Sequence, residues 1–93
     1  MIRNFNCKET EKLFKRIRSP KLPSDVQRTA MRKLVAIHAA RTLNALRAPP
    51  ANHLEALSGM RHGQHSIRIN DQWRICFRWC EGNAYDVEIT DYH

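Results

Sequence analysis

The sequence predicts an α+β fold in which two N-terminal helices pack on a small, mostly antiparallel sheet of about four strands. Two patterns support this class. Apolar residues recur at helical spacing in the first half of the chain, and they alternate with polar residues in the last third. With 93 residues the chain can form one modest core, so we expect a single domain over residues 1–93.

The first elements are a possible strand over residues 2–5 and a helix from residue 7 to about residue 18. Asn6 and Glu9 have the spacing of a capping box, and apolar side chains recur at helical intervals after them. Two prolines in residues 19–23 should end this helix, because proline lacks a donor and disfavours helical geometry in the preceding residue.

The second helix should be the longest element, from Ser24 to about Ala45. Ser24 is followed by an acidic residue, and Gln27 stands at the third helical position, which is a second capping signature. Its apolar stripe consists of Val26, Ala30, Leu34 and Ile37. We expect both helices to cover one face of the sheet. A connector over residues 53–62 should be anchored by its two leucines.

Three strands are predicted in the last third, with turns at residues 70–72 and 81–83, which favour an antiparallel meander. The first strand contains Ile67 and Ile69, and the third alternates apolar and polar residues up to Thr90. In the middle strand one face is apolar and the other basic. The expected core face holds Trp73, Ile75, Phe77 and Trp79, and the expected outer face holds Arg74, Cys76, Arg78 and Cys80.

The chain carries a formal net charge of +7, which favours nucleic acid, an anionic surface or an acidic protein as partner. The alternative is that the charge serves solubility alone. Three cysteines are an odd number, and Cys76 and Cys80 would lie about 13 Å apart on one strand, beyond disulfide reach. A reduced, cytoplasmic protein is therefore expected, with no export signal and no membrane span.

No cofactor or metal is predicted. His62 and His65 flank a glycine, but the sequence has no further ligands at metal-binding spacing.

Several motifs together resemble the HigB branch of the RelE/ParE toxin superfamily. They are Leu57-Ser58-Gly59-x-Arg61, Ser66-Ile67-Arg68-Ile69-Asn70, Trp73-Arg74-Ile75-x-Phe77 and Asp91-Tyr92-His93. The resemblance implies a metal-independent endoribonuclease that cuts mRNA in the A site of the 70S ribosome. It implies a HigA-type antitoxin with a helix-turn-helix fold, through which the pair binds its operator DNA.

The resemblance also assigns roles to particular residues. The implied catalytic residues are Arg74, Asp91, Tyr92 and His93. Basic segments that would meet RNA contain Arg61 and Arg68, and the first helix would present Lys12, Lys15 and Arg16 to ribosomal RNA, although a solvated helix face is the simpler interpretation of those three.

These residue types suit RNA cleavage, which needs proton transfer and a positive charge on the phosphate. Asp91, Tyr92 and His93 have reference pKa values of about 4, 10 and 6.5, and the Arg74 guanidinium can clamp a phosphate. The groups lie on one concave side if the last strand pairs with that of Arg74. Alternatively, the C-terminal residue is frayed, and Arg74 is solvated or paired with Asp86 or Glu88.

The sequence departs from the family pattern at two positions. Some relatives carry a histidine and a lysine where this chain has Glu55 and Ser58. A lost cation and an added acid should weaken phosphate binding, so we expect a slower nuclease.

A different class of function also fits the expected fold. ParE-like members of the superfamily inhibit a protein target such as DNA gyrase without catalysis, so the fold alone does not decide. A degenerate member that only binds antitoxin is a third possibility. The terminal Asp91-Tyr92-His93 together with Arg74 favours the enzyme.

Overall fold

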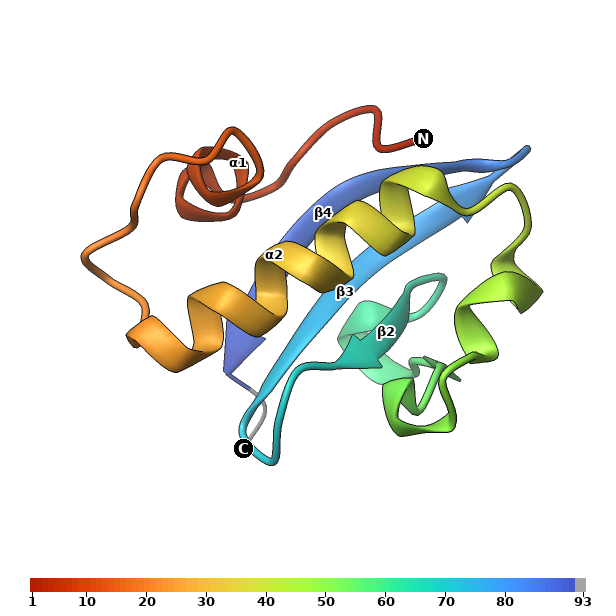
Figure 1. The fold of residues 1–93 in the computed structure, drawn as a ribbon. Coiled ribbons are helices and arrows are strands. Elements are labelled where there is room, and N and C mark those ends of the chain that lie inside the picture. Colours follow the sequence, from red (N-terminus) through yellow and green to blue (C-terminus); the bar gives the residue numbers. More distant parts are fainter. Residues whose placement is uncertain (92–93) are drawn as a thin grey trace.

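The computed structural model of the chain describes residues 1–91 and confirms the predicted α+β class. Two helices lie across one face of a four-stranded sheet, and short 3₁₀ helices flank its β2 side (Figure 1). The helices are α1 (Lys8–Phe14) and α2 (Ser24–Ala39). The strands are β1 (Glu55–Ala56), β2 (His65–Arg68), β3 (Trp73–Cys80) and β4 (Asn83–Asp91), and the 3₁₀ helices are η1 (Leu43–Arg47), η2 (Pro50–Asn52) and η3 (Gly59–Arg61).

The sheet is the predicted antiparallel meander, in the order β1-β2-β3-β4. Both predicted turns are present. Asn70 accepts hydrogen bonds from the backbone N–H groups of Gln72 and Trp73, and the β3–β4 turn has positive φ at Glu81 and Gly82. Strand β1 was not predicted, because two residues are too few for an alternating pattern.

The opening segment runs along β4 without forming a continuous strand. Isolated parallel bridges join Ile2 to Ala84 and Phe5 to Val87. The predicted strand over residues 2–5 is therefore reduced to two bridges beside the sheet.

The first helix is shorter than predicted because its backbone turns left-handed at Arg16, where φ is 66°. The Arg16 N–H donates to the Leu13 carbonyl at 3.0 Å, and the Ile17 N–H donates to the Lys12 carbonyl at 2.8 Å. This is a Schellman motif. Glycine usually occupies the left-handed position, so the sequence contained no stop signal there.

Neither predicted capping box forms. Cys7 and Pro23 are the N-caps, and the structure has no side-chain cap at either. Glu9 and Gln27 instead bind the fully buried Ser19. The Ser19 hydroxyl donates to Glu9 at 2.6 Å, and Gln27 Nε2 donates to the Ser19 carbonyl at 2.7 Å. The two side chains therefore fasten the interhelical linker to both helices.

The second helix is the longest, as predicted, but it ends at Ala39 rather than near Ala45. Its C-cap, Ala40, has an extended backbone, and the chain then re-forms as η1. Its apolar stripe meets the helix-facing side of the sheet in the core, whose fully buried members include Ala30, Leu34, Ile37, Ile67, Ile75 and Phe77.

The opposite face of β3 is less exposed than predicted. Arg74 is only 9% exposed and Cys76 is fully buried, whereas Arg78 and Cys80 are exposed as expected. The connector causes this burial. It places the His53 carbonyl against the Arg74 guanidinium, and it extends the Arg61 side chain across β4 to Glu88. Both connector leucines anchor it as predicted, since Leu57 is buried and Leu54 packs against the core.

Candidate active site

Arg74 is fixed in place at the start of β3 by groups from three segments. Its Nε donates to the buried Ser66 hydroxyl of β2 at 2.8 Å, and Nη2 donates to the His53 carbonyl at 2.7 Å. Nη2 also lies 3.1 Å from Oε1 of Glu55 on β1. Arg74 is therefore neither a solvated strand residue nor a partner of Asp86 or Glu88, and among residues 1–91 it pairs with Glu55.

An open pocket of about 330 Å³ lies beside this guanidinium, on the sheet face that the helices leave uncovered. It is lined by His53, Glu55, Arg68, Asn70, Asp71 and Arg74. Arg68 stands opposite Arg74 in the β2–β3 register and pairs with Asp71. The pocket therefore brings together two predicted arginines, Arg68 and Arg74, and two carboxylates.

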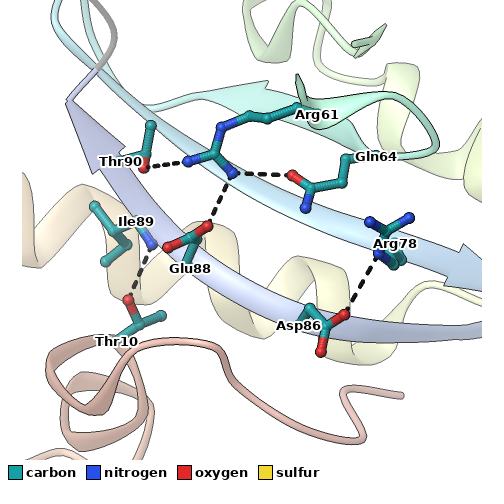
Figure 2. A network of polar contacts seen from close by, with 8 residues as sticks. All are labelled: Thr10, Arg61, Gln64, Arg78, Asp86, Glu88, Ile89 and Thr90. Carbon is teal, nitrogen blue, oxygen red and sulfur yellow. Dashed lines mark hydrogen bonds and ion pairs between the residues drawn. The ribbon is translucent and has the colours of Figure 1, made fainter. Parts of the chain in front are cut away.

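Arg61 does not line this pocket. Figure 2 shows its guanidinium reaching over β4, where Nη1 contacts Glu88 at 2.8 Å and Gln64 at 3.0 Å and Nη2 donates to the Thr90 hydroxyl at 3.2 Å. Arg61 thus ties the connector to the last strand. Burial is the main cause that raises the pKa of the nearby Cys76 thiol, and the positive charge of Arg61 partly opposes this shift.

The end of β4 pairs beside the strand of Arg74, as the candidate site required. Asp91 is opposite Trp73, and Thr90 is opposite Arg74. Since successive residues of a strand point to opposite faces, Asp91 belongs to the face opposite Arg74. Its carboxylate accepts a hydrogen bond from Gln72 Nε2 at 3.0 Å. The structure therefore does not bring Asp91 into the Arg74 pocket.

Tyr92 and His93, the other predicted proton-transfer residues, lie outside the described residues.

Every arginine on the sheet face opposite the helices has an acidic partner. The pairs are Arg61 with Glu88, Arg68 with Asp71, Arg74 with Glu55 and Arg78 with Asp86, the last also visible in Figure 2. The excess positive charge of the chain lies in its first half. Residues 1–47 hold 12 Lys or Arg and three Asp or Glu, whereas residues 48–93 hold four Lys or Arg and six Asp or Glu. The helical half therefore carries the excess charge.

The predicted RNA contacts of the first helix belong to this basic half. Lys12, Lys15 and Arg16 are all exposed. Lys12 and Lys15 make exposed ion pairs with Glu9 and Glu11, at 3.5 and 3.4 Å. Such pairs are weak, so both cations can turn to an external anion.

Three residues that line the pocket were missed by the sequence analysis. His53 contributes a backbone carbonyl, for which no sequence signal exists, and it adopts a left-handed conformation with φ of 45°. Asn70 was assigned to a turn and to the end of one family motif, and Asp71 was assigned to the turn alone, so neither was expected at the site. Their position in the turn that precedes Trp73 and Arg74, with Gln72 in between, is a signal that they border the site.

Candidate metal centres and membrane-spanning helices are both absent from the part of the chain that the structure describes. Over residues 1–91, no group of three or more His, Cys, Asp or Glu is placed to hold a metal ion. Within the same range, no helix has the length and apolar character needed to cross a membrane.

The meander, its two covering helices and the arginine pocket define a small, basic RelE-like α+β domain. A family model described as the RelE-like toxin HigB of type II toxin–antitoxin systems matches residues 3–93. The chain belongs to this HigB-like toxin family, and its type II class implies an antitoxin partner.

Individual relatives agree with the family. The chain is 35% identical over 94 residues to a Proteus vulgaris protein named Endoribonuclease HigB, with both chains covered completely. It is 37% identical over 71 residues to Toxin HigB-1 of Vibrio cholerae, covering 76% of this chain and 75% of the relative. An uncharacterized Haemophilus influenzae protein is 40% identical over 73 residues, which cover 78% and 71%.

Proposed function

We propose that this toxin is a ribosome-dependent endoribonuclease that cleaves mRNA in the ribosomal A site without a metal ion. The observation that carries the proposal is the Arg74 guanidinium, held by Ser66 and His53 at the wall of an open pocket. A relative named as an endoribonuclease supports the reaction type.

Arg74 has the role of phosphate clamp in this proposal. A fixed guanidinium stabilises the negative charge that develops on the phosphorus-bound oxygens as the 2′-oxygen attacks. Ser66 and His53 hold one orientation of Arg74, so little reorganisation is needed during the reaction. Arg68, on the same pocket wall, offers a second positive charge to the RNA.

Proton transfer is assigned to Tyr92 and His93. The histidine is the group whose ordinary pKa lies near neutrality, and it can therefore exchange protons at physiological pH. Asp91 has a supporting role in the proposal, because its bond to Gln72 holds the end of β4 against the turn before β3.

The basic helical half provides the affinity for the ribosome, with Lys12, Lys15 and Arg16 facing ribosomal RNA. The separation of charge supports this, since the pocket face is internally neutralised. The proposal includes a HigA-type antitoxin, operator binding through that antitoxin alone, and a cytoplasmic location.

The test is cleavage of an mRNA programmed into purified ribosomes, with chelator added as far as the ribosome tolerates it. Wild type should cleave, Arg74→Ala should lose at least about a hundredfold in rate, and deletion of His93 should abolish turnover. Arg78→Ala is the matched control, because Arg78 is exposed on the same strand and lies outside the pocket. A growth-inhibiting wild type that never cleaves would redirect the search to a protein target such as gyrase.

A further inference from the structure

A second hollow, of about 270 Å³, lies between the end of α1 and the start of α2. We call it the interhelical groove, and it is lined by Leu13, Arg16, Ile17, Arg18, Gln27, Arg28 and Met31. Ile17 is 52% exposed, although it is a large aliphatic residue. Its neighbours Leu13 and Met31 continue the apolar surface inward to the core.

Three arginines surround this apolar floor. Arg16, Arg18 and Arg28 are exposed, and within residues 1–91 no carboxylate forms an ion pair with any of them. The arginines of the opposite sheet face are all paired. The groove is therefore a place where positive charge and exposed apolar surface occur together without an internal partner.

The groove is also rigid. The Schellman motif fixes the backbone of Ile17, and Gln27 Nε2 donates to the carbonyls of Ser19 and Leu22 at 2.7 and 2.6 Å. A preorganised surface loses little conformational entropy when it binds a partner.

We infer that the interhelical groove is the docking site for an acidic, amphipathic segment of the antitoxin. Apolar side chains of that segment would cover Ile17 and Met31, and its carboxylates would reach Arg16, Arg18 and Arg28. RNA would use the arginines but would gain little from the exposed Ile17. A protein segment uses both, which makes a protein the better occupant.

This location also suggests a mode of neutralisation, which rests on the proposed function of the toxin at the ribosome. The groove includes Arg16 and adjoins Lys12 and Lys15, so a bound antitoxin would cover the surface proposed to meet ribosomal RNA. The Arg74 pocket lies on the other face of the sheet and stays open. The antitoxin would thus prevent ribosome docking without entering the active site.

The experiment is a calorimetric titration of the purified toxin with its cognate full-length antitoxin. Ile17→Ser should weaken binding roughly 10- to 100-fold, and Ile17→Asp should weaken it further by repelling the acidic segment. Arg28→Gln should weaken binding most at low salt. Val35→Ser is the matched control, because Val35 is 46% exposed on α2 outside the groove, and it should bind as wild type does.

Wild-type affinity in both Ile17 variants would overturn the inference. If those variants bind antitoxin normally while Arg28→Gln loses affinity for ribosomes, the groove is an RNA surface instead. The titration needs no nuclease activity, so it stays informative if the toxin proves not to cleave RNA. Ribosome co-sedimentation of the antitoxin complex tests the neutralisation mode separately.

Discussion

The carboxylate of Glu55 lies 3.1 Å from the guanidinium of Arg74, so the side chain proposed to hold the scissile phosphate already holds an anion. The two partners differ in exposure, with the Arg74 side chain 10% exposed and that of Glu55 52%. Arg74 is the fixed member of the pair. Glu55 stands at the mouth of the pocket, where an RNA phosphate can displace it.

Removing the charge of Glu55 should speed up cleavage. In Glu55→Gln the phosphate no longer competes with a carboxylate for Arg74, so we expect kcat/KM to rise roughly three- to tenfold. Single-turnover cleavage on programmed ribosomes measures this. A loss of activity greater than tenfold would show that the carboxylate takes part in the reaction, for example as a proton acceptor.

Ser66→Ala should lower activity by loosening Arg74. The buried hydroxyl accepts from Nε, and without it the guanidinium loses one of the contacts that orient it. We expect kcat/KM to fall about tenfold and the free energy of unfolding to fall by about 1–2 kcal/mol. Ser24→Ala is the control, since Ser24 is exposed at the start of α2 and lies outside the pocket. An unchanged rate would mean that the His53 carbonyl suffices to orient Arg74.

Ser19→Ala should destabilise the fold in a pH-dependent way. The Ser19 hydroxyl, and next the charge of Lys12, lower the pKa of Glu9 below its usual value. A lowered pKa in the folded state stabilises the protein above the unfolded pKa of about 4.3, and this stabilisation is lost as the pH falls further. The variant should melt a few degrees lower at pH 7.

Melting curves of both proteins at pH 7 and pH 3 provide the measurement. The difference between wild type and Ser19→Ala should shrink as the pH is lowered from 7 towards 3, because protonation of Glu9 removes the charged acceptor of the Ser19 hydroxyl. An equal difference at the two pH values would mean that the carboxylate charge contributes nothing to this contact.

Two of the three free cysteines, Cys76 and Cys80, should differ sharply in reactivity. Burial raises the pKa of Cys76 and keeps reagents away from it, whereas Cys80 is exposed. An aromatic disulfide reagent at pH 8 should modify Cys80 quickly and Cys76 only after unfolding in denaturant. Cys80→Ser should remove the fast phase. Rapid modification of Cys76 in the folded protein would show that the connector opens readily.

Strands β3 and β4 could be predicted because their alternating pattern is long and regular. The alternation from Trp73 to Trp79 determined the core face, and turn residues on both sides determined the meander. The helix ends could not be predicted in the same way. Arg16 adopts a conformation that usually signals glycine, and Glu9 and Gln27 bind Ser19 of the linker rather than the helix termini.

The candidate site was predictable in part. Arg74 and the unusual Glu55 were both singled out from sequence, and the structure places them in contact. The contribution of the His53 carbonyl could not be predicted from sequence, because a backbone group has no residue-specific signal. Whether Asp91 could reach Arg74 depended on the face of the sheet to which its side chain points. The register of β3 and β4 determines that face, and the sequence pattern alone does not give the register.

The parallel bridges between the opening segment and β4 make the order of synthesis important. The backbone N–H groups of Arg3 and Asn6 donate hydrogen bonds to the carbonyls of Ala84 and Val87. The segment that is synthesised first therefore finds its hydrogen-bond partners only in the last strand of the chain. Such distant contacts form late in folding. A nascent chain that lacks β4 has neither the support for its opening segment nor the Thr10–Ile89 bond seen in Figure 2. The toxin therefore acquires its native shape only after its last strand has left the ribosome that made it.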